Sequence, residues 1–164
     1  MSKTEQNLKD AFAGESQANR KYLAFAEKAD KEGYAQAARL FRAAAAAETV
    51  HAHAHLRTLK GVGATVDNLK EAIAGETHEF KNMYPAMIKE AKAEDHKAAL
   101  RSFEFANAVE KVHAQLYQKA LDNLQTLQET DIYVCNVCGY TCEGEAPDEC
   151  PVCKAKRKAF FKVE

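Results

Sequence analysis

Two glutamates that are each followed three residues later by a histidine carry the strongest chemical signal in this sequence. The pairs are Glu48 with His51 and Glu110 with His113. Five consecutive alanines, residues 43–47, precede the first pair and strongly favour a helix. Side chains three residues apart in a helix leave the same face. Each pair therefore presents a carboxylate and an imidazole together, and both groups are common metal ligands.

Each pair is preceded by a single glutamate in a repeated context. The pattern Ala-x-Ala-Gly-Glu ends at Glu15 and again at Glu76. The spacing is 61 residues between these two glutamates and 62 residues between Glu48 and Glu110. Two such repeats predict four helices, two with a lone Glu and two with Glu-x-x-His. This is the ligand set of a carboxylate-bridged two-metal site inside a helical bundle.

Four amphipathic helices must position these ligands, and the spacing of apolar residues predicts them over residues 4–33, 34–60, 67–92 and 95–124. Thr4 and Asp67 are the expected helix caps. Glu79 follows Glu76 by one turn and adds a further carboxylate to the third helix. Pro85 removes one backbone hydrogen bond from this helix, so we expect a kink just past the glutamates.

The composition narrows the classes of function. A formal net charge of -1, from 23 basic and 24 acidic residues without a basic block, argues against nucleic acid and anionic membranes as partners. The sequence has no apolar run near the roughly 18 residues of a membrane span, and its polar start lacks a signal-peptide core. These features predict a cytoplasmic protein whose partner is a small molecule or another protein.

All five cysteines lie near the C-terminus, and four of them form two Cys-x-x-Cys pairs, Cys135 with Cys138 and Cys150 with Cys153. Two such pairs are typical of a tetrahedral metal site, which zinc or iron would fit. The few aromatic residues nearby make a minimal core, so the metal should supply much of the folding free energy. The remaining thiol, Cys142, is expected to be a spectator. The composition predicts a helical domain over residues 1–130 and a metal domain over residues 131–164.

Taken together, these motifs resemble rubrerythrins over essentially the whole chain: Ala-Gly-Glu-Ser, Glu-Thr-Val-His, Gly-Glu-Thr-His-Glu, Glu-Lys-Val-His and the tail with Cys-x-x-Cys-Gly-Tyr and Cys-Pro-x-Cys. Ferritins have the bundle carboxylates without this tail, and rubredoxins have the tail without the bundle. The resemblance implies an all-α, ferritin-like four-helix bundle with a small C-terminal rubredoxin-like domain of short strands and loops.

The resemblance also implies an activity. Rubrerythrins are non-haem di-iron peroxidases, in which the di-iron centre reduces hydrogen peroxide to water and a rubredoxin-like Fe(Cys)4 site relays electrons to it. The electrons originate on NAD(P)H and arrive through a donor protein, a rubredoxin or an NAD(P)H-dependent reductase. We therefore expect three iron ions per chain, a role in oxidative-stress defence and a homodimer.

Carried over by motif, the resemblance gives each ligand a role. Glu48 and Glu110 are the expected bridging carboxylates, and His51 is the alternate ligand of the first iron. The terminal ligands are Glu15 and Glu79 for the first iron and Glu76 and His113 for the second. Two tyrosines, Tyr22 and Tyr84, lie about two turns after Glu15 and Glu76 and are expected to aim their hydroxyls at ligand carboxylates. The four paired cysteines, Cys135, Cys138, Cys150 and Cys153, would hold the mononuclear iron.

Plainer interpretations stay open beside these. Either tyrosine could be an ordinary core residue, and His53, His55 and His78 fall outside the expected ligand set. The chain could also be an iron-storage or iron-oxidising bundle with a structural tail, or a helical scaffold that carries a zinc-ribbon interaction module. Balanced charges in the tail argue against the last alternative. Catalytic peroxide consumption would favour the peroxidase over iron storage.

Overall fold

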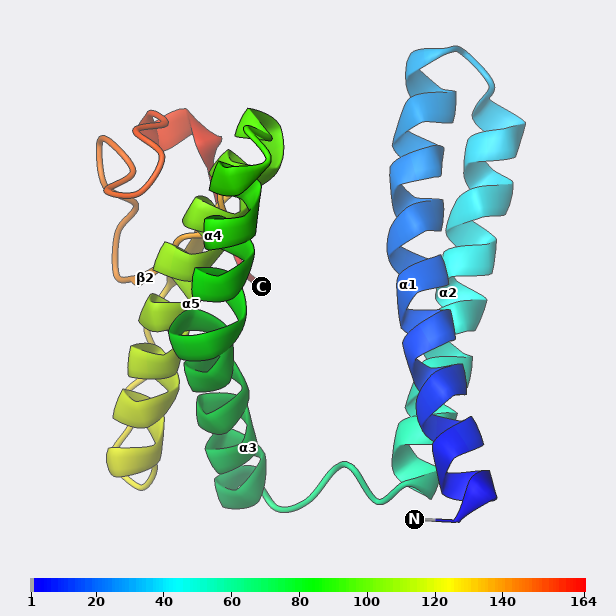
Figure 1. Cartoon of the computed structure of the whole chain (residues 1–164), viewed down its shortest axis with the longest axis horizontal. Helices are drawn as coiled ribbons and strands as arrows, with labels where there is room; N and C mark the ends of the chain where they lie inside the picture. Colours follow the sequence, from blue (N-terminus) through cyan, green and yellow to red (C-terminus); the bar gives the residue numbers. More distant parts are fainter. Residues whose placement is uncertain (1) are drawn as a thin grey trace. The chain divides into compact units, whose positions relative to one another are not determined.

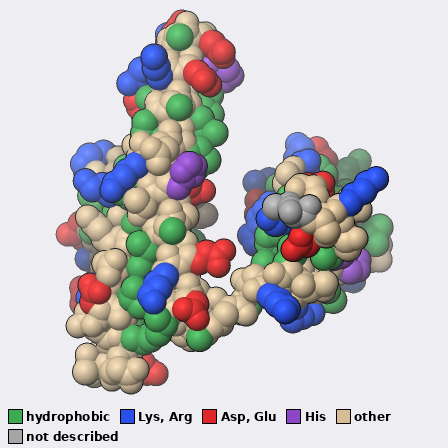
Figure 2. Space-filling view, turned by 60° about the horizontal axis from the view of Figure 1, so that its bottom comes forward, with side chains coloured by type: hydrophobic (Ala, Val, Ile, Leu, Met, Phe, Trp, Pro, Cys, Tyr) green, Lys and Arg blue, Asp and Glu red, His purple; other side chains and the backbone are tan. Residues whose placement is uncertain are grey.

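The computed structural model describes residues 2–164. The chain divides into two compact units, Met1–Gly63 and Ala64–Glu164. The boundary predicted after residue 130 lies inside the second unit and stays a prediction. On the face seen in Figure 2, acidic and basic side chains are interspersed on both units. None of the described helices is long and apolar enough to cross a membrane.

The first unit is a hairpin of two long helices, α1 (Lys3–Lys31) and α2 (Ala35–Thr58), which lie side by side in Figure 1. A reciprocal capping box starts α1: Glu5 N–H donates to Ser2 Oγ over 3.1 Å, and Ser2 N–H donates to Glu5 Oε2 over 2.8 Å. The cap is therefore Ser2, and the expected cap at Thr4 is wrong. Gly33, at φ +85°, adopts the left-handed conformation that ends α1.

The buried apolar residues of α1 and α2 are small. They are all alanines, namely Ala26, Ala29, Ala38, Ala45 and Ala52. Alanine lets the two backbones approach closely, but it buries little apolar surface. Larger side chains stay partly exposed, as Leu23 and Phe25 show with 37% and 46% of their surface accessible.

The second unit begins with three consecutive helical segments. These are α3 (Thr65–His78), a π-helical segment (Glu79–Met83) and α4 (Tyr84–Ala93), and they pack against α5 (Lys97–Asp122). Ala64 occupies the N-cap of α3 and Asp67 lies in its first turn, so the expected cap at Asp67 is wrong. A carboxylate in the first turn still favours the helix through its dipole.

The single helix predicted over residues 67–92 contains a wider turn at Glu79–Met83, and the kink predicted just past the glutamates stays a prediction. Pro85 cannot donate the hydrogen bond that an α-helix would direct to the carbonyl of Lys81. The π-helical turn lies immediately before this proline, and such turns occur often at functional sites. Glu79 is its first residue, one turn beyond Glu76.

The tail folds into a three-stranded antiparallel sheet. Its strands β1 (Ile132–Cys135), β2 (Thr141–Glu143) and β3 (Phe160–Lys162) are arranged in the order β2-β1-β3. In Figure 1, β2 lies beside α5, with which it also makes contacts. An ion pair between Lys119 and Glu143 joins the two elements. The tail thus packs on the helix that carries Glu110 and His113.

Candidate metal centres

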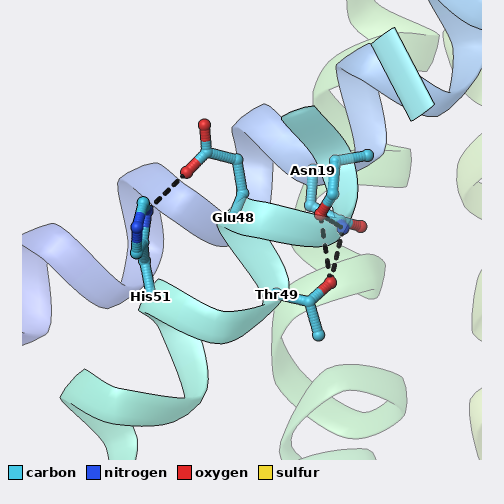
Figure 3. Close-up of polar contacts among 5 residues, drawn as sticks. Asn19, Glu48, Thr49 and His51 are labelled. Atoms are coloured by element: carbon cyan, nitrogen blue, oxygen red, sulfur yellow. Dashed lines mark hydrogen bonds and ion pairs between the residues drawn. The ribbon is translucent and has the colours of Figure 1, made fainter. Parts of the chain in front are cut away.

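The first unit brings together Glu15 from α1 with Glu48 and His51 from α2. One ligand atom from each lies within 4.8 Å of the other two. Nδ1 of His51 is 2.9 Å from Oε2 of Glu48, and Figure 3 shows the two side chains together on one side of α2. Three residues predicted from their spacing as metal ligands therefore converge within one helical hairpin.

Asn19 aligns the two helices at this cluster. Its Nδ2 donates across the helix contact to the carbonyl of Ala45 over 2.7 Å and to Oγ1 of Thr49 over 2.9 Å, the second of which Figure 3 shows. Only 8% of Asn19 is exposed, and it lies one turn after Glu15. Because its partners flank Glu48 in α2, Asn19 sets the register between the two carboxylates.

The second unit repeats the arrangement with Glu76 from α3 and with Glu110 and His113 from α5. Their ligand atoms also lie within 4.8 Å of one another. Nδ1 of His113 is 2.9 Å from Oε2 of Glu110 and 3.7 Å from Oε1 of Glu76. The other oxygen of Glu76, Oε2, is buried without a hydrogen-bond partner.

This second cluster has the electrostatics of a cation site. Burial, followed by the hydrogen bond and charge of Glu110, raises the pKa of Glu76 to about 7, while His113 opposes the shift. Two carboxylates and a ring nitrogen converge here, and one carboxylate oxygen lacks a donor. A divalent cation would neutralise the carboxylates and use these lone pairs, so the residues fit a metal ion.

Glu79, Tyr84 and Tyr22 are the other residues predicted for the di-iron centre. Glu79 is outside both three-residue clusters, at the start of the π-helical turn. Burial, then the negative charges of Glu110, Glu79 and Glu76, raises the pKa of Tyr84. Tyr22 packs against Phe25 and Phe41 with ring centroids 6.3 Å away in each case. The proposed hydroxyl contacts of both tyrosines stay predictions.

Four cysteines of the tail form the third cluster. Sγ of Cys135 is 3.6 Å from Sγ of Cys153, and Sγ of Cys138 is 3.6 Å from Sγ of Cys150. All four sulfurs lie within 4.8 Å of one another, which suits a tetrahedral ion. Cys142 is outside this cluster, with its Sγ 3.7 Å from the carbonyl oxygen of Glu145.

Backbone N–H groups around the cysteine cluster favour the thiolate form of Cys135 but do not offset the burial of Cys138. Burial opposes ionisation of Cys135, but hydrogen bonds from the backbone N–H groups of Val137 and Cys138 outweigh it and lower its pKa. Burial raises the pKa of Cys138 despite a hydrogen bond from the N–H of Tyr140. A bound cation would remove the remaining thiol protons, because a coordinating thiol is deprotonated.

A contact that the sequence did not predict joins the second cluster to the tail. Nε2 of His113 is 3.0 Å from Oγ1 of Thr141 in β2. Asn19 was also missed, although its place four residues after Glu15 on the inward face of α1 could have indicated it. Thr141 had no such signal, because it is 28 residues from His113 and the contact depends on how the tail packs.

Known proteins share both parts of this chain. Residues 6–121 match the family model described as Rubrerythrin, and residues 133–161 match the model described as Rubrerythrin, rubredoxin-like domain. The chain belongs to the rubrerythrin family. Rubrerythrin-2 of Clostridium acetobutylicum is 37% identical over 93% of this chain and 92% of its own length. Nigerythrin of Nitratidesulfovibrio vulgaris is 34% identical over 96% of this chain and 85% of its own length.

Solved structures agree with this assignment. The fully reduced, all-ferrous structure of nigerythrin matches with a TM-score of 0.61 and 33% identity, covering 99% of this chain and 88% of the other. The partially reduced nigerythrin structure gives the same values. These matches confirm the predicted fold class, a ferritin-like helical bundle with a rubredoxin-like C-terminal domain.

Family membership and the three clusters together define the general chemistry. This rubrerythrin is a peroxidase-like di-iron oxidoreductase with a rubredoxin-like domain. The two Glu/His clusters and the four-cysteine cluster are consistent with three iron ions per chain.

Proposed function

We propose that this rubrerythrin reduces hydrogen peroxide to water with electrons from NAD(P)H, as a homodimer in the cytoplasm that protects against oxidative stress. A rubredoxin or an NAD(P)H-dependent reductase delivers the electrons to the Fe(Cys)4 site, which relays them to the di-iron centre. The observation that carries this proposal is the pair of matching Glu/His clusters, with the cysteine cluster in the same unit as one of them.

The di-iron centre needs both Glu/His clusters. Each cluster has three ligand residues, which is too few for an iron ion without bridging carboxylates. We infer that Glu48 and Glu110 would be the carboxylates shared by the two ions, as the resemblance to rubrerythrins implies. Glu15 and Glu79 would complete one ion, and Glu76 and His113 the other.

Peroxide reduction consumes two electrons and two protons and releases two water molecules. The iron pair, when bound, supplies the two electrons, and the protein must supply hydrogen bonds and protons. Tyr84 keeps its hydroxyl proton at neutral pH, because a tyrosine ordinarily ionises only at about pH 10, and burial and the negative charges of three glutamates raise its pKa further. It can therefore donate a hydrogen bond to a peroxide oxygen, whereas an ionised tyrosine could not.

His51 and Glu79 are proposed as alternative ligands of the first iron. Four carboxylates, Glu15, Glu48, Glu76 and Glu110, already balance two ferrous ions, so a neutral imidazole suits the reduced centre. The oxidised centre carries two more positive charges and prefers the oxygen ligand Glu79. The convergence of His51 with Glu15 and Glu48 supports the first of these two arrangements.

The test is peroxide turnover in a reconstituted chain of NAD(P)H, reductase, donor protein and the iron-loaded protein. We expect catalytic NAD(P)H oxidation that depends on peroxide. Cys153→Ser should abolish this turnover, because it removes a ligand of the relay site. The reduced di-iron centre of that variant should still react once with peroxide. Iron loading without turnover would contradict the proposal and favour iron storage.

A further inference from the structure

Thr141, in strand β2 of the tail, contacts the second Glu/His cluster. Its Oγ1 lies 3.0 Å from Nε2 of His113 and 3.0 Å from the carbonyl oxygen of Gly139. Gly139 directly follows Cys138, one of the four clustered cysteines. One hydroxyl group therefore touches a ligand of one centre and the backbone beside a ligand of the other.

The hydrogen atoms of this contact can be assigned by elimination. A threonine hydroxyl has one hydrogen to donate, and a carbonyl oxygen can only accept. The Thr141 hydrogen is therefore directed to Gly139, and Oγ1 must accept a hydrogen from Nε2 of His113. This arrangement leaves Nδ1 as the ring nitrogen that faces Glu76 and Glu110, at 3.7 Å and 2.9 Å.

We propose that Thr141 is a positioning residue that holds His113 in the orientation and tautomer needed for Nδ1 to bind iron. The proposal rests on the di-iron function described above and extends it to a residue of the rubredoxin-like domain. A histidine ligand commonly donates its second N–H to a protein acceptor, which sets both the ring plane and the tautomer. Here a side chain of the tail supplies that acceptor.

Two contacts between the tail and α5 hold Thr141 in position. A Cβ atom at Gly139 would lie 3.7 Å from Cγ1 of Val109, so the tail backbone approaches α5 closely there. The ion pair of Lys119 and Glu143 secures the far end of β2. These two contacts lie on either side of the contact between His113 and Thr141 along α5, so β2 cannot slide along the helix without breaking one of them.

The surroundings of the hydrogen bond are mainly apolar. His113 and Thr141 line a cavity of about 510 Å³ in which most of the accessible surface is apolar, although Gln128, Glu129, Thr130 and Glu143 also line it. A hydrogen bond is stronger where water and other polar groups compete less for its donor and acceptor. Loss of the Thr141 hydroxyl should therefore free the His113 ring without an equivalent replacement.

Three variants of the full chain test this role. Thr141→Val removes the hydroxyl at nearly constant volume, and Thr141→Ser keeps it. Thr126→Val is the matched control, because Thr126 donates only to the nearby carbonyl of Asn123, over 3.3 Å. Removing an outer partner of a metal ligand typically weakens metal binding by about 10-fold to 100-fold. We expect that loss at the bundle centre for Thr141→Val alone.

Two measurements separate positioning from folding. Competition with a chelator, read by Mössbauer spectroscopy, reports iron in the bundle and in the tail separately. NMR of the zinc-loaded chain reports whether Nε2 of His113 carries a slowly exchanging proton. The wild-type, Thr141→Ser and Thr126→Val proteins should show this proton and retain bundle iron. Thr141→Val should lose the slowly exchanging proton and bind bundle iron about 10-fold to 100-fold more weakly, while its tail iron is kept.

Several outcomes would overturn the proposal. Thr141→Val could retain bundle iron as the wild type does, Thr141→Ser could fail to restore it, or the tail could lose iron equally, which would mean a structural role. A wild-type chain that binds tail iron but no iron pair would instead overturn the proposed di-iron function. The wild-type protein alone thus distinguishes the two failures.

Discussion

Replacement of Asn19 with alanine should destabilise the α1–α2 hairpin and loosen the first Glu/His cluster. The substitution removes two hydrogen bonds across the helix contact, to Ala45 and Thr49, from a residue that is only 8% exposed. Each such bond contributes about 1 kcal/mol to the free energy of unfolding. The acceptors keep other partners, because Thr49 itself donates to Ala45 over 3.1 Å and is open to solvent.

The free energy of unfolding should therefore fall by about 2 kcal/mol. No further penalty is expected, because no buried acceptor is left without a hydrogen-bond partner. For a chain of this length that corresponds to a melting temperature lower by about 4 to 8 °C. Thermal unfolding of the iron-free protein, followed by circular dichroism, measures it. Chelator competition on the iron-loaded protein should also show faster loss of iron from the bundle.

Ser16→Ala is the matched control on the same helix. Ser16 donates to the carbonyl of Phe12 over 2.7 Å, entirely within α1, so its loss should change stability by less than about 0.5 kcal/mol. A double-mutant cycle of Asn19→Ala with Thr49→Val should give a coupling energy of about 1 kcal/mol. Equal melting temperatures for Asn19→Ala and Ser16→Ala, or additive effects in the cycle, would refute the role given to Asn19.

Three further outcomes are expected. The purified protein should be red and contain about three irons per chain, and colourless protein with one zinc would contradict the assignment of the clusters. In the iron-free protein the pKa of Glu76 is raised to about 7, so the folded state holds its proton more tightly than the unfolded state. Stability should therefore fall by about 1 to 2 kcal/mol as the pH rises from about 4.5 to 7, and denaturant titrations of Glu76→Gln should lack this slope. Crystal structures of the iron-loaded protein should show His51 as a ligand only when fully reduced and Glu79 only when fully oxidised; identical coordination in both states would exclude the exchange.

Much of the candidate site could be predicted because its ligands are neighbours in the sequence or repeat at a regular interval. Glu48 and His51 must share a face of any helix that contains both, and the same holds for Glu110 and His113. Cys135 and Cys138 lie three residues apart in the sequence, so a single turn can bring both sulfurs to one ion. Helix type followed from apolar periodicity, which is a local property of the chain.

Local periodicity was less informative about how the helices begin and bend. The cap was predicted at Thr4, but Ser2 forms the capping box, because Glu5 lies three residues after Ser2 whereas Asn7 lies three residues after Thr4. Pro85 indicated a disturbance in the third helix, but not the form that this disturbance takes in the backbone. Only the folded backbone decided for the π-helical turn at Glu79.

The remaining features depend on contacts between elements that are far apart in the sequence. Asn19 acts across 30 residues on Thr49, and His113 meets Thr141 across 28 residues. Burial and the approach of Glu110 together raise the pKa of Glu76. No local pattern encodes such distances, because they arise when side chains from separate elements pack together. Sequence patterns were enough to select candidate metal ligands, whereas tertiary packing decided which other side chains contact them.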